Sequence, residues 1–491
     1  MTTAPSALAS PAAPMSKQRG PHTVLWTFLA SSFALFMAGL DNLVVTTALP
    51  SIKEDLGAGL SELEWTVNAY TLSFAVLLML GAALGDRFGR RKVFASGIAV
   101  FTLASALAAI APSTGGLIAA RAIQGAGAAA ILPLSLTILT RAVPAEKRPV
   151  ALGLWGGVNG LSVALGPLVG GAIVEHGSWQ WIFWLNVPLG LILVPLTLFK
   201  VEESHGPSKR LDLVGTTLVS LGMLGVVFGL VRGHGDGWAA PHIVGALAVG
   251  VALIAAFVAY ENRTAEPMLP MTMFKDRAFT ALTFSGLLMF AGVFGSIFLL
   301  TQYFQGVQGY SPLGAGLRIL PWTAMPVIVA PLAGPLAAKI GGRPLVIAGL
   351  AMSATGLAWF ALVASPHVTY AEQIPALVLC GLGMSLYFIP TASLLMSVVK
   401  PEQQGVASGT NNAMRELGGV FGVAVLASVF SANGGFVSAQ NFVDGLVPAL
   451  WVGAALAAVG SLTAALIPTR RTPAAAAPAD ADASAKVPVA A

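Results

Sequence analysis

The sequence predicts an all-α membrane protein that crosses the bilayer fourteen times. Hydrophobic residues make up 56% and charged residues 10% of its 491 residues, whereas a soluble domain carries about 25% charged residues. Fourteen stretches are apolar over about 20 residues, the length of helix that crosses a hydrocarbon core about 30 Å thick. Lys and Arg collect in alternate loops between these stretches, as expected of a protein with a fixed orientation in a membrane.

Charged, glycine or proline residues separate the apolar stretches and mark loops between them. Little of the chain is left over for a soluble domain. Taken in order, the predicted spans are 24–49, 63–84, 93–112, 116–140, 150–174, 180–199, 213–232, 241–261, 279–304, 313–338, 345–364, 372–397, 406–430 and 446–467.

The distribution of positive charge predicts that both termini lie in the cytoplasm. With the N-terminus inside, only Lys53 and Arg232 fall in outer loops, while most of the 26 Lys and Arg fall in cytoplasmic loops or tails. The net charge of +5 is therefore a topology signal rather than a sign of nucleic-acid binding. We expect a retained first span with no cleaved signal peptide. We also expect cytoplasmic tails at 1–23 and 468–491, the second of them disordered because its composition is of low complexity.

An internal repeat appears when the chain is shifted by 256 residues, which superimposes Gly85 on Gly341 and aligns glycines in later spans. Spans 1 to 6 then correspond to spans 9 to 14. This predicts two six-helix bundles, at 24–199 and 279–467, related by an axis along the membrane normal and with a binding site between them near mid-membrane. The remaining segment, 200–278, holds spans 7 and 8 between charged linkers. We expect it to be an inserted helical hairpin that faces lipid as a spacer.

Several functional classes find no support in the sequence. An ATP-driven pump needs a phosphate-binding loop such as GxxxxGK[ST], and the chain contains no Gly-Lys dipeptide. No HExxH, GxSxG or Cys/His cluster points to a membrane enzyme or a metal site. The single cysteine, Cys380, excludes an intramolecular disulfide. We therefore expect a protein without enzymatic activity, catalytic residues, cofactor or metal.

Four motifs occur in order at the predicted spans. They are LDNLVVTTALPSI in span 1, GDRFGRRK after span 2, RAIQGAGAAAILP in span 4 and GLWGGVNGLSVALGPLVGG in span 5. With them the chain resembles the drug:proton antiporters of the major facilitator superfamily, in the branch with fourteen spans, over residues 24–467. The resemblance implies the major facilitator fold and alternating-access export of hydrophobic, in some cases cationic, drugs or antibiotics across the cytoplasmic membrane in exchange for protons. The expected partners are lipophilic or cationic small molecules, protons and lipid, and we expect a monomer driven by the proton gradient alone.

The fifth span carries little side-chain bulk. Glycine lowers helix stability, so its repetition needs a reason. One explanation is close packing of this helix inside its own bundle. The other is a smooth surface along which the two bundles meet, and the resemblance equates this span with the signature of antiporters. The residues concerned are Gly153, Gly157, Gly160, Gly166, Pro167, Gly170 and Gly171.

Ionisable residues inside a span are candidates for function, and the sequence singles out Asp41, Arg121, Arg318, Arg415 and Glu416. At 1.5 Å per residue, Asp41 in span 1 and Arg121 in span 4 lie at a similar depth, about 12 Å and 8 Å from the outer ends of their spans, so they can pair. The resemblance implies that both take part in proton coupling. A static ion pair that holds the two spans together is the alternative. All six His residues fall in loops or at span ends, which leaves carboxylates as the proton carriers.

Span 13 contains NNAMREL, in which Glu416 lies about 15 Å from the cytoplasmic end and hence near mid-membrane. There it is placed for proton coupling, for attracting a cationic drug, or for both in competition. The alternative is its neutralisation by Arg415, or by Arg318 across the interface. Aromatic residues at helical spacing suit flat lipophilic compounds, although packing or lipid contact explains them equally well. The predicted substrate cavity comprises Asn411, Asn412, Arg415, Glu416, Arg318, Phe290, Phe294 and Tyr387.

The loop GDRFGRRK concentrates charge between two apolar spans. Its cations fit a cytoplasmic loop, but Asp86 and the two glycines need another reason. The resemblance implies a latch, in which the acid and an arginine bridge to neighbouring spans and to the other bundle and keep the cytoplasmic side closed, while the glycines permit a tight turn. The second copy of the repeat lacks the aspartate, so the latch belongs to the N-terminal bundle. Its residues are Gly85, Asp86, Arg87, Gly89, Arg90 and Arg91.

Three other functions stay open at this point. A dedicated exporter of one endogenous metabolite or antibiotic would use the same residues. A channel would need neither the sparse buried charges nor the glycine-rich span. A non-transporting membrane sensor or scaffold would leave Asp41 and Arg121 unexplained. Proton-coupled export of drugs is therefore the leading prediction.

Overall fold

The computed structural model describes residues 21–144, 147–206, 211–399 and 404–468, and these form helices without any β-strand. Apart from residues 21–23 and 468, the predicted tails lie outside the described part. The first helices are α1 (Pro21–Leu56), α2 (Leu60–Phe88), α3 (Arg90–Ala109), α4 (Thr114–Ala142), α5 (Arg148–His176), α6 (Trp181–Trp184) and α7 (Asn186–Lys200). Then follow α8 (Leu213–Asp236) and α9 (Pro241–Glu261). The last are η2 (Met271–Lys275), α10 (Arg277–Gln302), η3 (Tyr303–Val307), α11 (Pro312–Thr323), α12 (Met325–Ile340), α13 (Gly342–Val363), α14 (Tyr370–Val398), α15 (Gln404–Asn433) and α16 (Ala439–Ala465).

Within the described residues, 14 helical segments are long and apolar enough to cross a membrane, which confirms the predicted number of spans. Two predicted spans are broken. Span 6 is divided into α6 and α7 at Leu185, three residues before Pro188, and span 10 into α11 and α12 at Ala324, between Pro321 and Pro326. Proline lacks the N–H that a continuous helix requires, so the breaks fall beside prolines.

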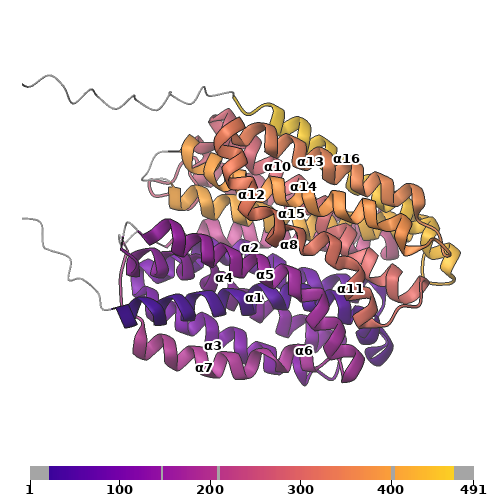
Figure 1. Cartoon of the computed structure of the whole chain (residues 1–491), viewed down its shortest axis with the longest axis horizontal. Helices are drawn as coiled ribbons and strands as arrows, with labels where there is room; N and C mark the ends of the chain where they lie inside the picture. The colour runs from indigo at the N-terminus through magenta and orange to yellow at the C-terminus, as the bar shows by residue number, and fades with distance from the viewer. Residues whose placement is uncertain (1–20, 145–146, 207–210, 400–403, 469–491) are drawn as a thin grey trace, which may run out of the picture.

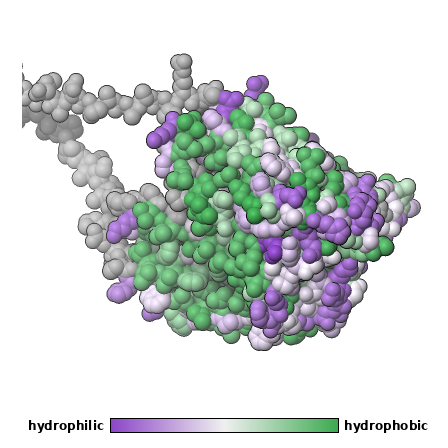
Figure 2. Space-filling view, turned by 45° about the vertical axis from the view of Figure 1, so that its right-hand side comes forward, coloured by the Kyte–Doolittle hydropathy of each residue, from purple (hydrophilic) through white to green (hydrophobic). Residues whose placement is uncertain are grey.

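The helices form two groups that lie side by side, with the first part of the chain below and the last part above in Figure 1. Helices α1–α7 pack mainly against one another, and so do α10–α16. The described chain begins and ends at the same end of the molecule, on the left in Figure 1, where the loop 85–92 also lies. We call this the basic end and the opposite one the far end. Figure 2 shows hydrophobic residues over the body of the molecule and hydrophilic ones gathered toward its ends, as expected of a protein in a bilayer.

The inserted hairpin is only partly the spacer that the sequence predicts. Helix α9 packs mainly on α8 and turns most of its surface outward, whereas α8 contacts both α2 and α15, one helix from each group. Val227 and Val231 of α8 are buried in one cluster with Leu72 of α2 and with Leu417 and Val420 of α15. The hairpin therefore joins the two groups through one face of α8, which covers one side of the seam between them, while most of the hairpin surface points outward.

On the other side of the seam, α5 meets α11 near the far end. A Cβ atom built on Gly171 would lie 2.7 Å from the Cα atom of Leu313, so the two backbones touch. The backbone N–H of Leu313 donates to Oε2 of Glu175 at 3.0 Å, and Nε2 of Gln305 donates to the carbonyl of Thr47 in α1 at 2.9 Å. The two groups are thus joined at the far end by backbone contact and by hydrogen bonds.

Toward the basic end, the same seam opens. A Cβ atom on Gly160 would reach only Val327 of α12, at 4.0 Å, and Cβ atoms on Gly156 and Gly157 would meet no atom of another helix within 4 Å in the described part of the chain. Among the described residues, the α5 seam is therefore in contact at the far end and without contact at Gly156 and Gly157, and we call this second part the open seam.

Candidate functional site

A buried ion pair lies in the middle of the first group of helices. Arg121 of α4 is fully buried, and its Nη1 contacts Oδ2 of Asp41 in α1, which is 3% exposed. The pairing expected from their depth is thus present. The guanidinium carbon of Arg121 also lies 4.3 Å from the centroid of the Tyr70 ring, and its Nε donates to the carbonyl of Thr66 at 3.2 Å. Helices α1, α2 and α4 therefore meet at one buried pair of charges.

Uncharged polar side chains complete the surroundings of Asp41. Its Oδ1 accepts hydrogen bonds from Nε2 of Gln124 and from Nδ2 of Asn186, both at 2.8 Å. The hydroxyl oxygen of Ser105 accepts from the same two amides, at 3.3 Å and 3.0 Å respectively. These three residues are absent from the predicted site, because the prediction around Asp41 rests on the ionisable residues of spans 1 and 4 alone. The position of Gln124 one turn after Arg121, on the same face of the helix, is the signal that could have found it.

Asp41 receives hydrogen bonds from three donors, one of which is charged. Charged and neutral donors together compensate a buried carboxylate, and arginine keeps its charge in proteins. The arrangement is therefore a buried ion pair in which the second carboxylate oxygen of Asp41 is also hydrogen-bonded.

A second carboxylate lies in the middle of α15. Glu416 is half-buried, and within the described residues it forms no hydrogen bond or ion pair. It interacts electrostatically with Arg415 on its own helix and with Tyr70 of α2, in the other group. Glu416 thus lies within electrostatic reach of one residue of the other group.

Arg415 extends instead toward α10 and α14. Its guanidinium carbon lies 4.4 Å from the ring centroids of both Phe290 and Phe388, an arrangement in which aromatic rings attract a cation. Its Nη1 donates to Oδ1 of Asn412 at 3.3 Å, and its buried Nε has no partner within the described residues.

The other predicted cavity residues of α10, α14 and α15 lie near this guanidinium. The rings of Phe290 and Phe294 are stacked with centroids 5.0 Å apart, and the Phe388 ring packs edge-on against Phe290 and Tyr387 at 5.6 Å and 5.9 Å. Asn411 is 4% exposed, and its Nδ2 has no hydrogen-bond partner in the described part of the chain. Three helices thus bring polar and aromatic side chains together at mid-membrane.

Arg318 lies apart from this cluster. Its guanidinium carbon is 3.3 Å from the centroid of the Tyr310 ring, its Nη1 donates to the carbonyl of Gly314 at 3.0 Å, and the hydroxyl of Tyr370 donates to its carbonyl at 3.1 Å. No ion pair joins Arg318 to Glu416 among the described residues. The idea that Arg318 neutralises this carboxylate is wrong for this structure, because its side chain is held over an aromatic ring near the start of α11.

A further carboxyl group, Glu64 of α2, is missing from the prediction although it lies inside the predicted span 63–84. It is 3% exposed, and its Oε2 is buried without a partner in the described part. Asn68, one turn later, is fully buried, and both its amide oxygen and its amide nitrogen lack partners there. Unpaired buried polar groups are rare. A complete count of acidic residues in the spans would have found Glu64.

The glycines of α5 permit close contact on two sides of the helix. Inside the first group, a Cβ atom on Gly166 would lie 2.6 Å from the Cβ atom of Leu43 in α1. Across the seam, the carbonyl carbon of Pro167 lies 2.8 Å from the Cβ position of Gly316 in α11. Both explanations of this helix therefore apply, at different residues. The surroundings of Gly153 lie outside the described part.

The turn in GDRFGRRK is made by one of its two glycines. Gly89 has a φ of +106°, a backbone conformation that L side chains rarely adopt. Gly85 is part of α2, and a Cβ atom there would lie 2.8 Å from Cδ1 of Leu134 in α4, so it serves close packing and the prediction that it forms the turn is wrong. Oδ1 of Asp86 pairs with Nε of Arg90 at 2.8 Å.

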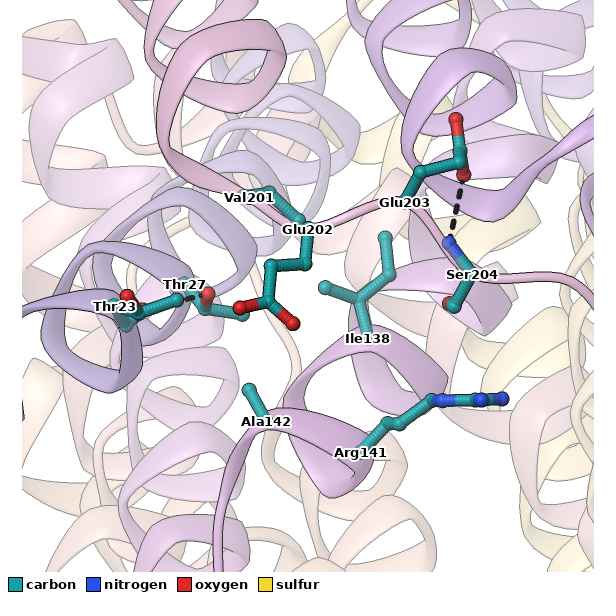
Figure 3. A pocket seen from close by; sticks show the side chains of 9 residues that line it. All are labelled: Thr23, Thr27, Ile138, Arg141, Ala142, Val201, Glu202, Glu203 and Ser204. Atoms are coloured by element: carbon teal, nitrogen blue, oxygen red, sulfur yellow. Dashed lines mark hydrogen bonds between the residues drawn. The ribbon is translucent and has the colours of Figure 1, made fainter. Parts of the chain in front are cut away.

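The partners of this loop come from the segment after α7. Nε of Arg91 lies 3.7 Å from Oε2 of Glu203, the carbonyl of Ser204 accepts from the backbone of Arg90 at 2.8 Å, and Gly206 donates to the carbonyl of Asp86 at 3.1 Å. Figure 3 shows the adjoining pocket, lined by α1, α4 and this segment. Among the described residues, this loop forms no hydrogen bond or ion pair with the other group, so the bridge that the resemblance implies stays a prediction.

Comparison with known proteins gives a consistent result. The sequence model described as Major Facilitator Superfamily matches residues 31–423. The multidrug resistance protein Stp of Mycobacterium tuberculosis is 38% identical over 84% of this chain and 76% of its own length. The tetracenomycin C resistance and export protein of Streptomyces glaucescens is 33% identical over 86% and 79%. Among solved structures, a POT family transporter has a TM-score of 0.68 at 14% identity, covering 89% of this chain and 94% of that one, which shows a shared fold.

Proposed function

The chain belongs to the major facilitator superfamily, and on that premise we propose that it exports lipophilic drugs or antibiotics from the cell in exchange for protons. It is a multi-pass protein of the cell membrane and a transporter rather than an enzyme, since its family and its curated relatives are transporters. The names of two relatives, a multidrug resistance protein and a resistance and export protein for tetracenomycin C, support outward transport of such compounds.

The orientation follows from the charge distribution. We assign the basic end to the cytoplasm, because cytoplasmic loops retain Lys and Arg. The two groups of helices then act as two bundles, at 24–199 and 279–467, and the open seam makes this the form that faces the cytoplasm. Closing that form would bring the cytoplasmic half of α5 against α12 and part the contact at Gly171.

The observation that carries the proposal is the set of partners around Asp41. Arg121 pairs with it, and Gln124 and Asn186 donate to it, in a form that we assign as open to the cytoplasm. In the form open to the outside, an arriving proton neutralises Asp41 and frees Arg121. Because each form favours one protonation state, proton entry can drive the conformational cycle.

Tyr70 connects this site with the substrate region. Its ring lies beneath the guanidinium of Arg121, its hydroxyl donates to the carbonyl of Ala38 at 3.1 Å, and it interacts electrostatically with Glu416 across the seam. Release of Arg121 would therefore alter the surroundings of Glu416. We assign Glu416 a second role in proton coupling, and a cationic drug would compete with the proton for this carboxylate.

The remaining predicted residues act in the movement of the bundles. We assign the glycines of α5 to the surface along which the bundles separate and meet, because they lie at both the closed and the open parts of the seam. The loop 85–92 would engage the second bundle only when the cytoplasmic end closes. In the present form Asp86 pairs with Arg90 inside the loop, and Arg91 approaches Glu203 of the segment after α7.

Purified protein in sealed liposomes tests the proposal. An imposed proton gradient should drive dyes or antibiotics against their concentration gradient, and a protonophore should stop this transport. Uptake of one compound alone from a panel of dyes, quaternary ammonium compounds and natural products would favour a dedicated exporter. Absence of gradient-driven transport for the whole panel would contradict the proposal and favour a sensor or scaffold.

A further inference from the structure

Three arginines that lie away from the ends of the described membrane-spanning helices are held in different ways. Arg121 is paired with a carboxylate, and Arg318 donates to a backbone carbonyl at the end of a helix. Arg415 has neither arrangement: its charge lies between two phenylalanine rings, and among the described residues its one hydrogen bond is to the amide oxygen of Asn412, at 3.3 Å. Aromatic rings and an amide oxygen compensate a buried cation only in part.

The neighbours of Arg415 offer donors but no carboxylate in an ion pair with it. The side-chain amide nitrogen of Asn411, one turn earlier, is buried and unpaired, like Nε of Arg415 itself. At Gly286 of α10, a built Cβ atom would meet the Tyr387 hydroxyl at 2.7 Å and Cγ of Arg415 at 3.1 Å, so these two side chains converge where the glycine leaves room. Glu416, the nearest carboxylate in sequence, forms no ion pair with Arg415 in the described structure.

Ring surface lies beside these donors. Phe294 and Phe388 are half-buried, and the stacked pair of Phe290 and Phe294 continues from the ring that flanks the guanidinium. A guanidinium presents a planar fork of N–H donors that matches a carboxylate. An acidic group there would supply the direct ion pair that Glu416 does not form, while an attached aromatic ring would extend over the phenylalanines.

We propose that Arg415 binds the acidic group of a substrate, so that the transporter accepts lipophilic compounds that carry a carboxylate or phenolate beside an aromatic ring. This inference rests on the proposed export function and names a substrate class for the predicted substrate site. Asn411 is a positioning residue that adds a second donor. The proposal assigns Arg415 and Glu416 to opposite kinds of ligand, the arginine to acids and the glutamate to protons or cations.

Two dyes with the same ring system separate these roles. Fluorescein is anionic at pH 8 and rhodamine 6G is cationic, and both contain a xanthene. Their binding to the purified full-length protein is measured at pH 8 by fluorescence polarisation. Arg415→Gln should weaken fluorescein binding by about tenfold or more, the value of a lost charge-assisted hydrogen bond, while rhodamine 6G binding stays within about twofold. Arg415→Lys should weaken fluorescein binding less, because it keeps the charge.

Arg232→Gln is the matched control, because it removes one positive charge from an exposed position on α8 that is paired with Asp236. It should change neither affinity. Unchanged fluorescein binding in Arg415→Gln, or equal loss of both dyes, would overturn the proposal. If Arg415→Gln does not fold, the wild-type protein provides the test. Equal affinity of the wild type for fluorescein and for an uncharged fluorescein diether would also refute the proposal. If fluorescein binding contradicts this inference but rhodamine 6G is still exported in liposomes under a proton gradient, the proposed function stands and only the assignment of Arg415 fails.

Discussion

Replacing Asp41 with Asn should abolish proton-driven accumulation while leaving substrate binding intact. The carboxylate accepts from Arg121, Gln124 and Asn186. An amide has one acceptor oxygen, so its nitrogen would face at least one of these donors. The substitution also removes the group that takes up the proton, and no other carboxylate among the described residues pairs with Arg121.

The size of both effects can be estimated. Arg121 is fully buried, and breaking a buried ion pair from one side costs about 3–5 kcal/mol, so the midpoint of thermal unfolding in detergent should fall. A gradient of one pH unit stores about 1.4 kcal/mol per proton, which supports about tenfold accumulation of a neutral substrate at one proton per cycle. A variant without the proton site should reach equal concentrations on the two sides.

The assay measures accumulation of a transported dye in liposomes with and without a gradient of one pH unit. Asp236→Asn is the matched control, because Asp236 is a carboxylate at the far end of α8 that pairs with Arg232 on the surface. It should accumulate dye like the wild type. Tenfold accumulation by Asp41→Asn would refute the coupling role, and an unchanged unfolding midpoint would refute the estimate for the buried pair.

Three further predictions concern the movement and packing of the helices. Gly171→Ala should destabilise the form closed at the far end by about 1–3 kcal/mol, because its Cβ would overlap the backbone of α11. Gly157→Ala should instead hinder closure of the basic end. Maleimide labelling of cysteines introduced along the open seam should shift in opposite directions in the two variants, and shifts in the same direction would contradict this. Asp86→Asn should slow transport, while the dissociation constant of the transported dye stays within about twofold of the wild-type value. A transport rate equal to that of the wild type would leave the loop only the role of fixing the orientation in the membrane. Val227→Ala should lower the free energy of unfolding by about 1–2 kcal/mol, because packing of α8 between the two groups is lost. Val251→Ala, on the outward face of α9, should have little effect. Equal effects of the two substitutions would count against a role for α8 in the seam.

The number of spans and the pairing of Asp41 with Arg121 could be predicted from the sequence for a simple reason. A bilayer leaves backbone groups no partners outside the helix, so the length of an apolar run determines where a membrane helix lies. Depth then follows from residue count at 1.5 Å per residue. Two charged groups at one depth in neighbouring spans have few other partners, and Asp41 and Arg121 are paired in the structure.

The direction in which each side chain points could not be predicted in this way. Lipid tails and a protein interior are similarly apolar, so hydropathy does not distinguish the face of a helix that meets lipid from the face that meets another helix. Helix α8 reads as a lipid-facing span yet seals a seam, and Arg318 and Arg415 look alike in sequence yet lie over different rings. The amino-acid order therefore determines the spans, their depth and the candidate charges, while packing between helices determines which charges meet, which remain unpaired and which end of the molecule is open.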